Sequence, residues 1–189
     1  MTRLVVLRSD DHVRMPWANG GGTTYQVATS PQGAGLDAFD WRVSLADVDS
    51  GGRFSTFAGI DRILMVVEGP GMELVVDGRF VPLVALDPLR FDGAADTSAT
   101  LVDGPTRDLN VMTRRGRCTA TLAVVAVAGV VDVAPVEDGD VLVVVVDGDV
   151  RADDVPLWPR DVLWLAERGS TLRGTATVAI VAIRPEGTA

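Results

Sequence analysis

The chain of 189 residues contains no lysine and has one cysteine, one histidine and one tyrosine. A P-loop ends in Gly-Lys-Ser/Thr, so the missing lysine excludes that phosphate-binding motif. Cys118 can form no intramolecular disulfide and has no cluster of other ligands for a metal site, which fits a reducing cytoplasm. His12 is the sole histidine and no Gly-x-Ser-x-Gly motif is present, which argues against a Ser-His-Asp hydrolase.

Positive charge is scarce as well. The chain carries 17 arginines against 26 acidic residues, a net charge of −9, so nucleic-acid phosphates would be repelled. The longest apolar stretch, residues 120–131, is shorter than the roughly 20 residues that a membrane-spanning helix needs. The N-terminal apolar segment is too short for a signal peptide. We expect a cytoplasmic protein with no nucleic-acid or membrane partner.

Short runs of β-branched residues between Gly, Asp and Pro recur along the chain, and no segment sustains helical spacing. The pattern predicts an all-β protein. The expected strands cover residues 2–7, 24–28, 41–47, 63–67, 73–76, 99–102, 109–113, 118–127, 140–146, 162–165 and 176–183.

Two Asp-Gly pairs, Asp77-Gly78 and Asp147-Gly148, follow strand-like runs and predict type I′ hairpin turns. Because similar strand and turn patterns surround both pairs, we expect two small barrels. The predicted domains are residues 1–118 and 119–189, packed as one compact body.

The loop over residues 16–24 has three glycines after Asn19, which describes a specified backbone path. No strand–helix context for dinucleotide binding follows it, because residues 23–28 favour a strand. Two interpretations stay open: a ligand-facing loop, or a tight turn at which two backbones pass closely.

Four stretches in order resemble the HutD/Ves family of bicupin proteins. The sequence differs from the usual family pattern at Ala18, Ala58 and Leu109, which bears on ligand specificity more than on fold. The stretches are PWANGGGT (16–23), FDWRVSLA (39–46), GRFSTFAGIDR (52–62) and RDLNVMTRR (107–115).

The resemblance implies a bicupin of two cupin-like, RmlC-type double-stranded β-helix barrels without a metal. It also implies a link to histidine utilisation and binding of a small acidic intermediate such as N-formylglutamate. No firmly assigned catalytic activity comes with it.

A typical cupin metal centre needs about three imidazoles and a carboxylate, which one histidine cannot supply. We expect no metal or other cofactor, and a surface position for His12. If Gly69 is aligned with the glycine that closes the first cupin motif, Arg62 takes the place of the metal-binding Glu. Ser55 and Phe57 then take the places of the paired histidines.

An arginine in that place favours an anionic ligand, because its fork pairs with a carboxylate. The structural alternative is an ion pair between Arg62 and Asp61 or another barrel carboxylate. In residues 41–47, a period of two puts Arg42 and Ser44 on one face, toward solvent or toward a barrel lumen.

The remaining candidate ligand contacts are Asn19, Asn110 and Trp17. The two Asn amides suit an amide or formyl group, although Asn in a Gly-rich loop often completes a turn with its own backbone. Trp17 suits a pocket wall or a core anchor.

Three functions follow. The first is a binding protein that senses a small carboxylate, and we expect binding more than catalysis. The second is a metal-free isomerase or lyase that uses carboxylates and Tyr25 for acid–base chemistry. The third is a scaffold whose barrel is filled by side chains. A homodimer is left open.

Overall fold

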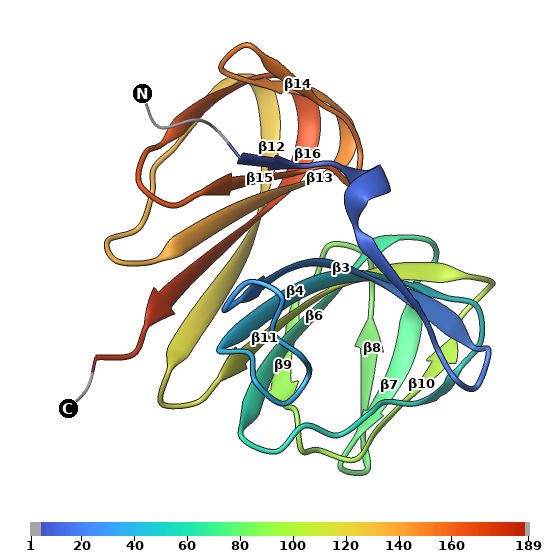
Figure 1. The fold of residues 1–189 in the computed structure, drawn as a ribbon. Coiled ribbons are helices and arrows are strands. Elements are labelled where there is room, and N and C mark those ends of the chain that lie inside the picture. Colours follow the sequence, from blue (N-terminus) through green and yellow to red (C-terminus); the bar gives the residue numbers. More distant parts are fainter. Residues whose placement is uncertain (1–4, 188–189) are drawn as a thin grey trace. The chain divides into compact units, whose positions relative to one another are not determined.

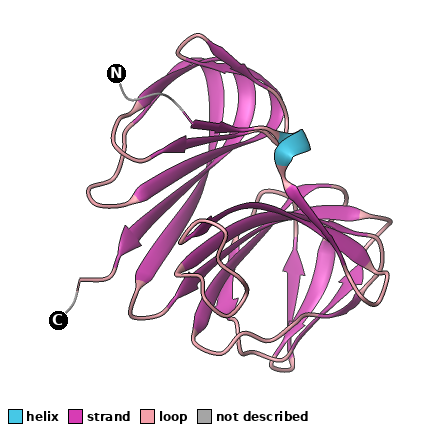
Figure 2. Cartoon of the chain, viewed as in Figure 1, coloured by secondary structure: helices cyan, strands magenta, loops and turns pink. Residues whose placement is uncertain are grey.

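The computed structural model describes residues 5–187, and it is built almost entirely of strands, with one short helical turn, η1 (Ser9–Asp11) (Figure 2). Contacts divide the chain into two units, one of residues 13–118 and one that joins residues 119–189 to residues 1–12 (Figure 1). The all-β prediction is confirmed.

The first residues differ from the predicted domain assignment. Strand β1 (Val5–Leu7) pairs antiparallel with β15 (Val162–Leu165), so it completes the C-terminal sheet and not the N-terminal barrel. Arg8 then donates to the carboxylate of Asp161 at 2.6 Å, which fixes the segment there. Residues 2–4 of the predicted first strand lie outside the described residues.

The unit of residues 13–118 consists of a six-stranded and a four-stranded sheet. The larger sheet has the order β2 (Val13–Pro16), β3 (Gly22–Ser30), β4 (Trp41–Val48), β11 (Thr106–Arg114), β6 (Ile60–Glu68), β9 (Leu89–Asp92). The smaller sheet has the order β5 (Gly52–Arg53), β10 (Thr97–Leu101), β7 (Met72–Val76), β8 (Arg79–Leu83).

The two sheets pack against each other through one end of their inner faces. Leu64 and Val66 of the larger sheet share a buried apolar cluster with Met72 and Leu74 of the smaller one. The unit is therefore held together as two facing ladders and not as one closed hydrogen-bonded barrel. The remainder of the inner face of the larger sheet carries side chains outside this apolar cluster.

The C-terminal unit is built on three long strands of 16, 13 and 16 residues, namely β12 (Cys118–Val133), β13 (Asp140–Ala152) and β16 (Ser170–Pro185). They belong to one sheet in the order β1-β15-β13-β16-β12. The short strand β14 (Val155–Leu157) pairs with β13.

The first predicted hairpin is confirmed and the second is wrong. Asp77 and Gly78 have φ of 48° and 76° and join β7 to β8. Asp147 and Gly148 instead lie inside β13, at a bulge where the strand keeps pairing with β16. A Cβ at Gly148 would stand 2.3 Å from the carbonyl oxygen of Thr175, so glycine here permits close backbone approach and not a turn.

The bulge in β13 has a structural consequence for the core. A one-residue irregularity exchanges the faces of all later side chains in a strand. Accordingly, Val143 and Val145 before the bulge, and Val150 and Ala152 after it, all belong to the same buried cluster.

His12 is buried, with 9% of its surface exposed, and not at the surface as expected. None of the helical structure in residues 5–187 has the length and apolar character that a membrane crossing requires.

Candidate functional site

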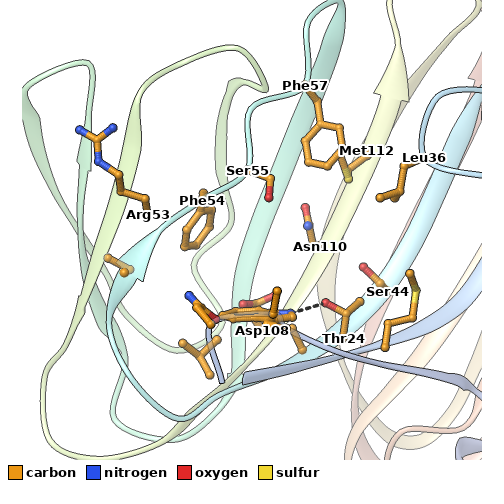
Figure 3. Close-up of a pocket in the computed structure, with 18 of the residues that line it drawn as sticks. Thr24, Leu36, Ser44, Arg53, Phe54, Ser55, Phe57, Asp108, Asn110 and Met112 are labelled. Carbon is orange, nitrogen blue, oxygen red and sulfur yellow. Dashed lines mark hydrogen bonds between the residues drawn. The ribbon is translucent and has the colours of Figure 1, made fainter. Parts of the chain in front are cut away.

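The candidate site is a cavity of about 400 Å³ on the inner face of residues 13–118 (Figure 3). Every residue that lines it comes from this unit. All six predicted ligand contacts line it, namely Trp17, Asn19, Arg42, Ser44, Arg62 and Asn110.

Three adjacent strands, β4, β11 and β6, supply the polar wall. Their antiparallel register places Arg42 and Arg62 opposite the same residue, Met112. Since neighbouring strands lie about 4.8 Å apart, the two arginine Cα atoms are separated by about 10 Å. The face of β4 that carries Arg42 and Ser44 is thus the inner face of the unit.

The next positions along the same face are also polar. Asn110 lies opposite Ser44, and Asp108 lies opposite Ala46. Leu109 and Val111 point to the other face and are fully buried there. The alternation in β11 therefore delivers one carboxylate and one amide to the cavity.

Arg62 is buried, with 5% exposed, and its guanidinium lies 5.1 Å from the ring centroids of both Phe54 and Phe91. Its Nε donates to Oδ1 of Asn110 at 3.4 Å. Burial lowers the pKa of Arg62 to about 10, with Arg42 also lowering it and Asp108 opposing them. The guanidinium thus remains charged at neutral pH, and its terminal nitrogens hold no ion pair with the described residues.

The structural alternative for Arg62 was an ion pair with Asp61 or another barrel carboxylate. In the structure, Asp61 accepts instead from Nε of Arg115 at 2.6 Å. Asp61 and Arg62 point to opposite faces of β6, as successive residues of a strand do. The other barrel carboxylate near Arg62 is Asp108, whose charge raises the pKa of Arg62, but the two side chains form no ion pair among those of the described residues.

Arg42 is the second buried cation. Its Nε donates to Oε1 of Gln26 at 3.0 Å, and its terminal nitrogens face the sulfur atoms of Met112 and Met15 at 3.9 and 3.8 Å. Burial lowers the pKa of Arg42. Thioether sulfur is a weak acceptor, so these nitrogens retain most of their capacity to bind an anion.

Asp108 has 3% of its surface exposed, and burial raises the pKa of its carboxyl to about 7; Arg62 lowers the value and Asp47 raises it further. Ser44 is 1% exposed, and its Oγ has no hydrogen-bond partner among the described residues. Buried polar atoms are normally paired, so both groups point to a ligand or solvent in the cavity.

The glycine-rich loop combines both interpretations left open by the sequence. Asn19 Oδ1 accepts from the backbone N–H of Gly21 at 3.0 Å, as a turn-forming Asn does. A Cβ at Gly22 would lie 2.3 Å from the carbonyl oxygen of Asp47. The loop is thus a close-packed turn, and it also forms one wall of the cavity.

Trp17 likewise serves packing and lining together. Its ring packs against the apolar cluster between the two sheets, and its Nε1 donates to Oγ1 of Thr24 at 2.8 Å. Figure 3 shows Thr24, Ser44 and Asn110 around the same hollow as Asp108.

The residues aligned with cupin metal ligands, Arg62, Ser55 and Phe57, all line the cavity. No group of three or more His, Cys, Asp or Glu side chains within residues 5–187 is arranged to hold a metal ion. Where a typical cupin would have its metal ligands, this chain thus has a guanidinium, a hydroxyl and an aromatic ring.

Sequence reasoning missed three residues at or beside this cavity. Phe54, in the loop after β5, and Phe91, in β9, flank Arg62, and only the three-dimensional pairing brings them there. Asp108 could have been found, because it shares the two-residue period of Asn110 in β11.

The fold and cavity define the class: an all-β, cupin-like protein in which arginines line the candidate site. The cupin fold is supported by a cupin 2 barrel protein from Leptotrichia buccalis, at a TM-score of 0.53, 14% identity, and coverage of 87% of this chain and 89% of that one. The chain belongs to the HutD family, whose model matches residues 9–182. The predicted HutD/Ves membership is confirmed.

Two curated proteins are similar to this chain. A 21.2 kDa protein from the hutC 3′ region of Pseudomonas putida is 46% identical over 123 residues, which are 65% of this chain and 64% of that protein. The chain therefore spans just under two thirds of that relative. Protein Ves of Cronobacter sakazakii is 33% identical over 86% of this chain and 89% of its own length.

Among solved structures, HutD from Pseudomonas fluorescens SBW25, in a formate condition, has a TM-score of 0.84 and 34% identity. The match covers 98% of this chain and 100% of that one. The likeness therefore extends over both units.

Proposed function

We propose that this chain is a small-molecule-binding protein that holds a small carboxylate in the cavity of residues 13–118. The observation that carries the proposal is Arg62, a buried guanidinium without an ion-pair partner among the described residues. Leaving a buried charge unpaired is costly, and a bidentate carboxylate is the best match for a guanidinium fork. A bound anion would supply the missing partner.

The rest of the cavity supports a small ligand with carbon as well as charge. A volume of about 400 Å³ lies in the range of small-molecule sites. Arg42 offers a second cationic contact, and Ser44 offers an unpaired hydroxyl. Trp17 and Phe57 supply ring surface against which a short carbon chain can pack.

Family membership supports a role in histidine utilisation. A relative comes from the hutC region of Pseudomonas putida, and a HutD structure is described in a formate condition. We therefore infer a sensor role in histidine utilisation with N-formylglutamate as the first ligand to test, since it combines carboxylates with a formyl amide.

The test is a thermal-shift screen followed by calorimetric titration. N-formylglutamate, glutamate and urocanate are compared with the diamide of N-formylglutamate, which has the same skeleton without charge. A ligand that binds only the folded state raises Tm with concentration, and the diamide should not. The proposal fails if none of the carboxylates binds at millimolar concentration, or if the diamide binds as well.

The enzyme alternative has one observation in its favour, the buried carboxyl of Asp108 with a pKa of about 7. A group that titrates near neutrality suits acid–base catalysis. The tyrosine assigned to this alternative, Tyr25, pairs with Leu45 and is absent from the described cavity lining. Proton NMR of each ligand incubated with the protein would detect turnover, and unchanged spectra would reject this alternative for those ligands.

The scaffold alternative requires a barrel filled by its own side chains. The cavity argues against it.

A further inference from the structure

The cavity holds a carboxyl group beside the cations that the proposed function assigns to the ligand. Asp108 is 3% exposed and lines the cavity, and no hydrogen bond or ion pair reaches its carboxyl oxygens from the described residues. A buried carboxylate is normally paired, so this arrangement calls for an explanation.

The charged groups around Asp108 come from both neighbouring strands. Arg62 on β6 and Arg42 on β4 are two rows of side chains away along the same face, with the row of Asn110 between them and Asp108. Asp47, the next residue after its β4 partner Ala46, acts against ionisation of Asp108, although Asp47 is itself paired with Arg107 at 2.6 Å. On the facing sheet, Arg53 has a side chain that is 80% exposed.

The formal charge of this wall depends on Asp108. With the carboxyl ionised, the two buried arginines and Asp108 sum to about one positive charge, and with the carboxyl neutral they sum to about two. A ligand carboxylate near Arg62 would place a second negative charge in the same low-dielectric space. Two carboxylates that share a site cannot readily both ionise, so one of them takes a proton.

We propose that a carboxylate entering this cavity is bound together with one proton, which Asp108 takes up from solvent. This inference rests on the proposed function, and it makes ligand binding dependent on pH. The balance is simple: the ionised Asp108, one proton and the ligand anion give a complex in which a neutral carboxyl lies beside the bound carboxylate. The Asp108 O–H then donates to a ligand oxygen, a short and charge-assisted hydrogen bond.

The proposal predicts how affinity varies with pH. In the ligand-free protein the pKa of the Asp108 carboxyl is about 7, and ligand binding raises that pKa further. Affinity is then independent of pH well below 7 and falls by up to about tenfold per pH unit above it. Arg62, with a pKa of about 10, stays charged between pH 6 and about 8.5 and does not contribute.

The experiment is calorimetric titration of the full chain with N-formylglutamate, whose carboxyl groups ionise below about pH 5. Titrations at pH 8 in buffers of different ionisation enthalpy give the number of protons taken up. We expect a value approaching about one for the natural chain. In Asp108→Asn, whose amide donates without titrating, we expect no uptake, no pH dependence, and tighter binding than the natural chain at pH 8.5.

Asp47→Asn is the matched control, because it removes a neighbouring carboxylate that does not line the cavity. It should retain proton uptake. Binding without proton uptake by the natural chain overturns this inference and leaves the proposed function intact, and so does uptake that persists in Asp108→Asn. If no carboxylate binds, the proposed function fails and this inference fails with it. The buffer series on the natural chain decides the matter even if Asp108→Asn does not fold.

Discussion

Arg62 donates its Nε hydrogen to Oδ1 of Asn110 at 3.4 Å, so the amide orients the guanidinium from the neighbouring strand. The terminal nitrogens of Arg62 remain available toward the cavity that both residues line. Orientation by Nε and recognition by the terminal nitrogens are separable, and substitutions can test them separately.

We predict that Arg62→Met weakens carboxylate binding strongly and that Arg62→Lys weakens it less. Lysine keeps the charge and loses the fork, whereas methionine loses both, at a cost of about 2 to 5 kcal/mol of binding free energy. Calorimetric titration with N-formylglutamate measures the effect. Arg79→Met, on an exposed strand position, is the matched control and should bind normally.

Thermal unfolding without ligand distinguishes binding from structure at Arg62. Loss of Arg62 breaks no ion pair among the described residues, but it removes the attraction to the buried Asp108 carboxyl. At pH 6, where that carboxyl is mostly neutral, Tm should therefore change little. A large loss of stability with unchanged affinity in the surviving fold would instead make Arg62 a structural residue.

The sequence could predict which residues share a face, but not what that face meets. The period of two in β4 correctly grouped Arg42 with Ser44, yet solvent and lumen give the same pattern. The contact between Arg62 and Asn110 depends on pairing of strands 48 residues apart, which no local pattern encodes. Asp108 shares the two-residue period of Asn110 in β11, so it could have been grouped with Asn110, but the period does not say which face of the strand is internal.

Turn chemistry was informative only where the chain actually reverses. Asp77-Gly78 and Asp147-Gly148 have the same residues, but the second pair lies at a bulge within a continuous ladder with β16. Glycine suits both geometries, so the dipeptide alone cannot separate them. The length of the partner strand, far along the chain, decides the outcome.

Ser44→Ala should weaken ligand binding without destabilising the protein. The hydroxyl is buried and has no hydrogen-bond partner among the described residues, so its removal costs the free protein nothing and relieves desolvation. Loss of a hydrogen bond to a charged ligand costs about tenfold in affinity. Calorimetric titration and urea unfolding measure the two effects, with Ser98→Ala, outside the cavity lining, as the control. Equal affinity of Ser44→Ala and the natural chain would remove Ser44 from the site.

His12 should make stability fall in mild acid. Burial lowers the pKa of His12 below 6.5, although the Leu7 carbonyl, Asp161 and Asp11 oppose the effect. The unfolded chain therefore binds more protons than the folded one as the pH decreases. The contribution to stability is fully present above about pH 6.5 and is lost as the pH falls toward the folded-state pKa.

Urea unfolding at pH 7.5 and pH 5 checks this expectation. His12→Gln cannot titrate, so its loss of stability between the two pH values should be smaller than that of the natural chain. Parallel losses in the two proteins would show that protonation of His12 is not coupled to unfolding.

Gly22→Ala tests whether the glycine-rich loop is a fixed wall of the cavity. A Cβ at this position would lie 2.3 Å from the carbonyl oxygen of Asp47 and 3.0 Å from the ring of Trp17. Backbone cannot yield as a flexible side chain can, so the loop must move away from β4. We expect a loss of about 1 to 3 kcal/mol in the free energy of unfolding.

The same displacement should reach the ligand, because Trp17 lines the cavity and is tied to Thr24 by a hydrogen bond of 2.8 Å. Carboxylate affinity should therefore fall together with stability in Gly22→Ala. Gly35→Ala, where a Cβ meets nothing within 4 Å, is the control and should change neither quantity. If both variants unfold at the same urea concentration, the close approach at Gly22 does not hold the loop. If Gly22→Ala is destabilised but binds normally, the loop is only a turn, and the cavity wall that matters for the ligand lies on β4, β11 and β6.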